Sequence, residues 1–219
     1  MIGSLPRVTR ALLIANGAAF LLQLALGAQA LAPLMLWPIG GEAAGGQGFL
    51  PWQLVSYGFL HGNVPHLLFN MLALAMFGAP LEHTWGPRRF LVFYIACIAG
   101  AALCQLAVGA WMMSQGGGAY PTVGASGGVF GLLLGYGLLF PNQRVMLLIP
   151  PIPMKARTLV VVYGFITLLL GITGAMPGVA HFAHLGGMVF GWLLIRYWRG
   201  QPPFGGPRRK PKRPMRIVP

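Results

Sequence analysis

Apolar residues dominate six stretches of the chain, and short segments rich in glycine, proline or basic residues separate them. A helix needs about 20 mostly apolar residues to cross a bilayer, with a usual range of about 17 to 25. The pattern therefore predicts an all-α fold, a polytopic membrane protein with six transmembrane helices. These helices are expected near residues 11–33, 64–84, 90–112, 124–140, 157–173 and 180–198.

The composition supports a membrane location for almost the whole chain. Of its 219 residues, 56% are hydrophobic and only 8% are charged, whereas a soluble domain carries about 25% charged residues. So few charges cannot cover a surface that faces water. Residues 1–199 are therefore expected to form one transmembrane domain. From residue 200 to residue 219, prolines and basic residues predict a disordered cytoplasmic tail.

The net charge of +13 would usually suggest nucleic acid as a partner, but the positions of the basic residues argue against it. All 15 separate or flank the apolar stretches instead of lining one face. Basic residues concentrate in cytoplasmic loops, and the loops near 34–63, 113–123 and 174–179 contain none. Both termini are therefore predicted on the cytoplasmic side of the cell membrane, where anionic lipids are the expected partners.

Five polar residues inside the predicted helices are candidates for chemistry, because polar groups within a bilayer are costly and usually functional. The second, fourth and sixth helices run in the same direction, and all five residues fall in their first two turns. At about 1.5 Å per residue, they share one depth, roughly 5–10 Å below the outer surface. We expect them to form one site. They are His66, Asn70, Ser126, His181 and His184.

Ser126 lies in a glycine-rich segment at the start of the fourth helix, which leaves backbone amides free to bind an oxyanion. A serine hydroxyl needs an adjacent base to act as a nucleophile. The chain has no aspartate, and its two glutamates are predicted in the outer loop (Glu42) and near the cytoplasmic end of the second helix (Glu82), where neither can reach the site. A Ser–His dyad is therefore predicted. The simpler alternative is that Ser126 only caps a helix.

Glycines at intervals of four predict that the fourth and sixth helices pack closely. This packing would bring Ser126 to His184, which lies one turn deeper than His181 and directly above the glycines of its helix. His184 is therefore the predicted base, whereas His181 could cap the helix or face the headgroups. The glycines are Gly127, Gly131 and Gly135 in the fourth helix, and Gly187 and Gly191 in the sixth.

His66 and Asn70 are four residues apart, so they share one face of the second helix. Side-chain donors in this position can stabilise a tetrahedral oxyanion together with the Ser126 amide. The alternative is that both residues only bond neighbouring helices.

Three other classes of protein are compatible with parts of the pattern. A transporter or channel would also have polar residues in its helices, but at several depths. A metal site could be built from His61, His66, His181 and His184, although the chain has no His-Glu-x-x-His motif. A non-catalytic binder of membrane helices should lack one dyad residue. We expect no metal and no cofactor.

The chain resembles the rhomboid family over nearly its whole length, because four motifs of that family occur along its six predicted helices. The Gly-x-Ser-Gly motif falls at Gly124–Gly127, and the Ala-His motif followed by glycines falls at Ala183–Gly187. The His-x-x-x-Asn motif falls at His66 and Asn70. A structural Gly-x-x-x-Glu-x-x-x-Gly motif is centred on Glu82.

The resemblance implies a six-helix rhomboid-like bundle of the bacterial type and an intramembrane serine endopeptidase. The implied catalytic residues are Ser126 and His184, with His66 and Asn70 stabilising the oxyanion. It also implies single-span membrane protein substrates, cut near their outer ends after entry between the second and fifth helices. Two positions depart from the family. Gln53 follows Trp52 where arginine is common, so an electrostatic role there is doubtful. Phe130 stands four residues after Ser126, where many members have tyrosine. The Phe130 ring is still expected to pack against His184.

Overall fold

The computed structural model of the protein describes residues 5–44, 46–146, 151–176 and 178–204. Most of the predicted tail, from residue 205 to residue 219, therefore lies outside the described residues. The elements are α1 (Arg7–Leu26), η2 (Ala28–Leu34), η3 (Gly41–Ala44), α2 (Gln53–Ser56), η4 (Tyr57–Phe59), α3 (Val64–Ala73), η5 (Leu74–Gly78), α4 (Ala79–Trp85), α5 (Pro87–Ser114), α6 (Ser126–Leu139), β1 (Arg144–Met146), β2 (Pro153–Lys155), α7 (Ala156–Thr173) and α8 (His181–Trp198).

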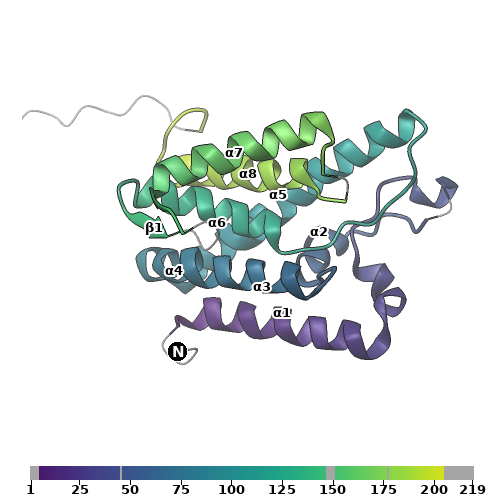
Figure 1. Ribbon diagram of the computed structural model, residues 1–219, viewed down its shortest axis with the longest axis horizontal. Coiled ribbons are helices and arrows are strands. Elements are labelled where there is room, and N and C mark those ends of the chain that lie inside the picture. Colours follow the sequence, from purple (N-terminus) through teal and green to yellow (C-terminus); the bar gives the residue numbers. More distant parts are fainter. Residues whose placement is uncertain (1–4, 45, 147–150, 177, 205–219) are drawn as a thin grey trace, which may run out of the picture.

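The long helices lie side by side, with α1 at one edge and α7 at the opposite edge (Figure 1). The short elements α2 and η3 lie at one end of this bundle, which we call the loop end. The strands β1 and β2 form an antiparallel pair at the other end, the hairpin end. Helices α3 and α6 begin toward the loop end and run toward the hairpin end.

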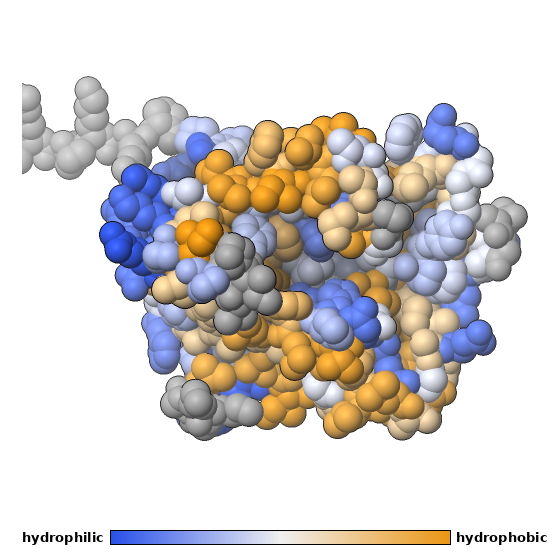
Figure 2. All heavy atoms as spheres, in the orientation of Figure 1, coloured by the Kyte–Doolittle hydropathy of each residue, from blue (hydrophilic) through white to orange (hydrophobic). Residues whose placement is uncertain are grey.

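The predicted class is confirmed: the protein is an all-α polytopic membrane protein. By length and composition, α1, the continuous segment α3–α4, α5 and α7 are each able to cross a membrane, whereas α6 is apolar but only 14 residues long. Apolar side chains cover much of the sides of the bundle, and the most hydrophilic surface gathers at the hairpin end (Figure 2). This distribution suits a bundle whose sides face lipid and whose ends face water.

Helices occur in all six predicted stretches, but some details differ. The first helix was expected to reach residue 33 and instead ends at Leu26, because Gly27 has a positive φ of 81° that breaks the helical path. The second contains a π-helical turn at Leu74–Gly78. Pro80 follows this turn, and since proline has no N–H to donate, the regular hydrogen-bond pattern cannot pass through it unchanged.

The segment between α6 and α7 forms no helix where the structure describes it. A β-hairpin there was not anticipated. Arg144 pairs with Lys155, Val145 with Met154, and Met146 with Pro153.

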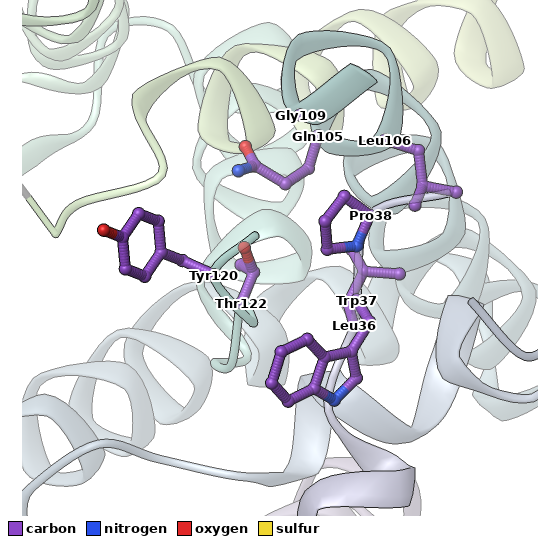
Figure 3. A pocket seen from close by; sticks show the side chains of 8 residues that line it. All are labelled: Leu36, Trp37, Pro38, Gln105, Leu106, Gly109, Tyr120 and Thr122. Atoms are coloured by element: carbon purple, nitrogen blue, oxygen red, sulfur yellow. The ribbon is translucent and has the colours of Figure 1, made fainter. Parts of the chain in front are cut away.

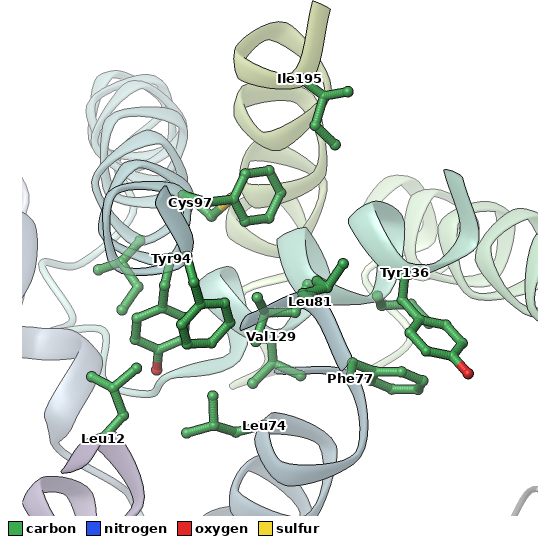
Figure 4. Packing of buried hydrophobic residues seen from close by; sticks show 14 of the residues in the cluster. Leu12, Leu74, Phe77, Leu81, Tyr94, Cys97, Val129, Tyr136 and Ile195 are labelled. Atoms are coloured by element: carbon green, nitrogen blue, oxygen red, sulfur yellow. The ribbon is translucent and has the colours of Figure 1, made fainter. Parts of the chain in front are cut away.

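One apolar cluster holds the bundle together, and it draws side chains from α1, from α3–α4 and from α5, α6 and α8 (Figure 4). Large aromatic and aliphatic residues fill its centre, where Leu74, Leu81 and Tyr94 have no exposed surface. Phe77 and Tyr136 lie at the α6 side, with ring centroids 5.3 Å apart. The cluster therefore fixes α3–α4 against α6, two elements that carry predicted site residues.

A buried carboxylate ties α1 to α4. Glu82, only 4% exposed, accepts hydrogen bonds from the Val8 N–H at 2.9 Å, the Thr9 N–H at 2.7 Å and the Thr9 hydroxyl at 2.8 Å. The first amides of a helix have no acceptor within it, and a negative charge there also interacts favourably with the helix dipole. The Glu82 motif thus has the structural role that the resemblance implied.

Changing Glu82 to glutamine is expected to destabilise the protein. One acceptor oxygen becomes an amide N–H₂ that faces donors, so the change should cost about 1 to 3 kcal/mol. Thermal unfolding in detergent would measure this as a lower Tm. Thr9→Val, which removes only the hydroxyl bond, should cause a smaller drop, and equal stability of all three proteins would contradict this role of Glu82.

Candidate active site

Ser126 is the first residue of α6, and the backbone around it leaves amide groups free. Gly124 has a φ of 132°, which L-residues rarely adopt, and this conformation turns the chain sharply into the helix. The N-cap residue Ala125 has no polar side chain to bond the first turn. The Ser126 N–H therefore has no acceptor within α6 and is available to a ligand.

His184 lies in the first turn of α8, next to Ser126. The distance between His184 Nε2 and Ser126 Oγ is 2.8 Å, which is hydrogen-bond length. The structure thus brings together the two residues for which the sequence predicted contact. Neither glutamate of the chain orients the imidazole, because Glu82 bonds the start of α1 and Glu42 lies in η3 at the loop end.

Aromatic contacts hold the His184 ring instead. The Phe130 ring stacks on it with centroids 4.3 Å apart and planes inclined by 6°, so the expected contact is confirmed. His181 meets His184 edge-on, with centroids 6.2 Å apart. His181 is buried, with only 7% of its surface exposed, and so it does not face the headgroups. The stacked Phe130 ring fixes the plane in which Nε2 points at Ser126.

Close approach of α6 and α8 makes the short contact possible. A Cβ added to Gly187 would overlap the Gly127 carbonyl, and one added to Gly131 would lie 3.1 Å from the Gly187 carbonyl oxygen. The two helices touch backbone to backbone directly below the dyad, as the glycine spacing predicted. On the other side, Ala101 of α5 packs against Gly127 and Gly186.

His66 lies beside the same serine. A Cβ added to Gly124 would lie 2.8 Å from His66 Nε2 and 3.6 Å from Ser126 Oγ. The Gly62 N–H donates to His66 Nδ1 at 3.4 Å. A ring nitrogen that accepts a hydrogen bond carries no proton, so the neutral ring has its proton on Nε2. The ring Nε2–H of His66 therefore faces the space next to the Ser126 hydroxyl.

Asn70 lies one turn below His66 and is 5% exposed. Its amide donates one N–H to the His66 carbonyl at 2.8 Å. An asparagine amide has two N–H groups, so the second remains for another acceptor. This backbone bond also orients the Asn70 side chain along the helix face that holds His66.

The comparisons with known proteins agree with these motifs. The model of the rhomboid domain matches residues 49–200, which include all of the candidate residues. The chain belongs to the rhomboid family.

Several named rhomboids are similar to this one. RHOMBOID-like protein 4 of Arabidopsis thaliana is 36% identical over 170 residues, which cover 74% of this chain and 39% of the relative. Rhomboid protease GluP of Bacillus subtilis is 31% identical over 143 residues, which cover 65% of this chain and 25% of GluP. RHOMBOID-like protein 2 of Arabidopsis thaliana is 32% identical and is covered to 41% of its length. The chain thus spans between a quarter and about two fifths of these relatives.

The alternative of a metal site finds no support in this rhomboid. Among the residues that the structure describes, no three His, Cys, Asp or Glu side chains come together as a ligand set. His61 and His66 are neighbours, with ring centroids 5.1 Å apart, and His181 and His184 form a second pair.

Sequence reasoning missed Tyr57 of η4, which links the segment before α3 to the candidate site of this rhomboid. Its hydroxyl donates to the Ile98 carbonyl at 2.9 Å, and its carbonyl accepts the Gly124 N–H at 3.0 Å. Tyr57 thereby holds the turn that leads into Ser126. A tyrosine in an aromatic-rich loop gave no signal of this, because only the folded backbone places Gly124 beside it.

Gln23 of α1 was also missed. Its amide bonds the backbone of His61 twice, accepting from the His61 N–H at 2.9 Å and donating to the His61 carbonyl at 3.2 Å. The His61 side chain is buried in the loop before α3, and burial, with a smaller contribution from His66, lowers its pKa to about 4. His61 is therefore a neutral ring against which His66 packs.

The glutamine at the position where arginine is common in rhomboids acts through its amide. Gln53 is fully buried, accepts the Trp37 N–H at 3.1 Å and donates to the Pro33 carbonyl at 3.2 Å. These bonds close the long loop on itself without a charge. Gln53 therefore lacks the charge of the arginine that is common here, but its amide still holds the loop by hydrogen bonds.

A small pocket lies between this loop, α5 and the segment that leads to α6 (Figure 3). Its volume is about 20 Å³, enough for about one water molecule. Gln105 and Thr122 supply polar side chains to its lining, and Tyr120 stands at its edge with 78% of its surface exposed. Thr122 also pairs with Leu36 of this loop, so the pocket lies where the loop meets the segment that leads into α6.

Replacing Asn70 by alanine should slow the reaction if its free N–H binds the oxyanion. The loss of one such donor costs on the order of tenfold to a thousandfold in kcat, and KM should change little because the donor acts in the transition state. Leu24→Ala on the exposed face of α1, away from the proposed substrate entrance, is the control. Steady-state kinetics on a model substrate would measure both variants, and unchanged kcat in Asn70→Ala would reject this role.

Proposed function

We propose that this rhomboid is an intramembrane serine endopeptidase of the bacterial six-helix type that uses Ser126 and His184 as a dyad. The observation that carries the proposal is the 2.8 Å contact between the serine hydroxyl and the histidine ring. The two residues come from different helices, 58 positions apart, and glycine packing is what brings them together. A helix-capping serine would need no imidazole at this distance.

The geometry supports acyl transfer followed by hydrolysis. His184 Nε2 accepts the proton of the Ser126 hydroxyl while Oγ bonds the substrate carbonyl carbon. His184 then gives this proton to the amine nitrogen as the peptide C–N bond breaks. In the second half, His184 removes a proton from water, the resulting hydroxide attacks the ester carbonyl, and Ser126 recovers its proton as it leaves.

Three donors surround the place where the carbonyl oxygen would carry its charge. The free Ser126 N–H, the Nε2–H of His66 and the second amide N–H of Asn70 come from two helices, α6 and α3. Donors fixed before the reaction lower the barrier because they need not reorganise as charge develops.

The proposed substrates are single-span membrane proteins that enter between α3 and α7 and are cut near their outer ends. Helix α7 is the least covered of the long helices, with 17% of its apolar window buried, and Phe165 is 64% exposed. On α3, Leu68 and Phe69 are 60% and 59% exposed. Two loosely covered apolar helices on either side of the dyad support lateral entry from the bilayer. The top turn of a substrate helix must unwind, because its carbonyls are otherwise hydrogen-bonded.

The proposed location is the cytoplasmic membrane, with six spans and both termini in the cytoplasm. The basic residues that flank the helices at the hairpin end support this orientation, since positive charge favours the inner side. The dyad then opens toward the outer face, and the basic inner face attracts anionic lipids.

Cleavage of a model single-span protein in liposomes, with mass spectrometry of both fragments, tests the proposed function. The expected result is one cut near the outer end of the span, which requires both Ser126 and His184 and is not affected by a chelator. Fragments that still form with Ser126→Ala, or that disappear only with the chelator, would contradict the proposal.

A further inference from the structure

The outer face of the β1–β2 hairpin carries an unusual pair of charges. Arg144 and Lys155 are both exposed and stand directly opposite each other in the antiparallel ladder. Side chains opposite each other have Cβ atoms about 5 Å apart, and like charges in this position destabilise the pair. The inner face consists of Val145 and Met154, which pack on the apolar cluster.

No carboxylate side chain of the chain offsets this repulsion. The sequence contains only Glu42 and Glu82. Glu82 is engaged by the start of α1, and Glu42 lies in η3 at the loop end of the bundle, whereas the hairpin is at the opposite end (Figure 1). An anion from outside the chain would relieve the repulsion between these two cations.

Backbone hydrogen bonds hold the hairpin in place at these two residues. Beyond the ladder, the Ala156 N–H donates to the Gln143 carbonyl at 2.8 Å and the Arg157 N–H donates to the Pro141 carbonyl at 3.2 Å. These bonds join the hairpin base to the first turn of α7. Val145 is buried beneath the hairpin, with 5% of its surface exposed. The backbone register thus fixes where the two side chains begin, and their long stems can adjust to an anion between them.

Apolar side chains adjoin the charges. Met146 is 58% exposed and Ile152 is 48% exposed, and both lie further along the hairpin than the two cations. Figure 2 shows the strongly hydrophilic surface of this end directly beside apolar surface. Cations next to exposed apolar side chains match a ligand that has a charged head and a hydrocarbon tail.

We propose that the outer face of the hairpin binds an anionic phospholipid. Its phosphate lies between the Arg144 guanidinium and the Lys155 ammonium, which form charge-assisted hydrogen bonds with the phosphate oxygens. Its hydrocarbon lies along Met146 and Ile152. The site is formed by the described residues of the hairpin and does not depend on the proposed protease activity.

Native mass spectrometry of the full chain in a neutral detergent tests this site, with phosphatidylglycerol and phosphatidylcholine of identical acyl chains as probes. We expect the wild type to retain one phosphatidylglycerol at least tenfold more tightly than phosphatidylcholine. Arg144→Gln with Lys155→Gln should lose this preference. The control Arg7→Gln with Arg88→Gln removes two exposed charges elsewhere and should keep it. Equal losses in the two double variants would show general surface charge only and overturn the site.

Two further variants distinguish loss of the binding site from misfolding, and a bound phospholipid from a bound free anion. The exchange Arg144→Lys with Lys155→Arg keeps both charges and should retain the bound lipid within about threefold. Ile152→Ser should weaken lipid retention because it removes apolar contact. If inorganic phosphate displaced the lipid at the same concentration, or if Ile152→Ser had no effect, the site would bind free anions and the proposal of a phospholipid would fail.

Discussion

Ser126→Ala and His184→Ala are each expected to lower the rate of peptide hydrolysis by about 10⁴-fold or more, since a nucleophile and its only base act as one unit. A fluorophosphonate, which reacts with an activated serine, should label the wild type and should not label Ser126→Ala. His184→Ala should be labelled far more slowly, because the hydroxyl would lose the acceptor that lies 2.8 Å away. Gel fluorescence after labelling measures all three proteins.

Both variants should remain folded, because neither residue is part of the apolar cluster. The double variant should be no slower than either single variant, since removing one member already disables the pair. Rapid fluorophosphonate labelling of His184→Ala would mean that another group activates the serine.

Gly187→Ala is expected to disable the site without touching either reacting group. The new methyl group would overlap the Gly127 carbonyl, which is backbone of α6 and cannot move alone. Helix α8 must shift away, so the distance from His184 to Ser126 grows. Overpacking costs about 1 to 3 kcal/mol, and a displacement of about 1 Å in an active site lowers the rate by about 100-fold.

Gly17→Ala in α1 is the matched control for this effect. It makes the same chemical change within a long helix, but a Cβ there meets nothing within 4 Å. It should leave labelling unchanged and stabilise the protein by about 0.5 to 1 kcal/mol, because alanine favours helix more than glycine does. Gly187→Ala should therefore lower both the Tm and the labelling rate, whereas Gly17→Ala should raise the Tm and leave the labelling rate unchanged. Normal labelling of Gly187→Ala would refute the packing argument.

Much of the fold followed from the sequence because lipid imposes simple requirements on a chain. Apolar length located all six helical stretches, and the glycine spacing predicted which two helices touch. The pair of Ser126 and His184 could be selected because the chain has no carboxylate that could reach the serine, and because His184, unlike His181, lies directly above the glycines of its helix. The contact of Phe130 with His184 was expected from the resemblance to rhomboids, in which tyrosine is common at this position, and the structure shows the stacked rings.

Features that depend on the loop backbone could not be predicted in this way. The bonds of Tyr57 to Gly124 and of Gln23 to His61 join segments far apart in the chain, and neither glutamine nor tyrosine has a spacing that marks such a bond. His181 was placed too close to water, because its position at the start of a helix says nothing of what covers it. The hairpin lay within a proline-rich segment whose strands are only three residues long.

Helix α1 contributes no candidate catalytic residue and lies before residue 49, where the rhomboid match begins. Yet Glu82 at the hairpin end and His61 at the loop end both bond it. A fragment that starts at residue 49 would keep Ser126 and His184 but lose the three hydrogen bonds that Glu82 accepts from Val8 and Thr9, and bonds to a charged group contribute about 1.5 to 3 kcal/mol each. The minimal unit able to fold around the dyad therefore extends upstream to include residues 7–26, and a separately supplied peptide of that segment should restore a truncated protein.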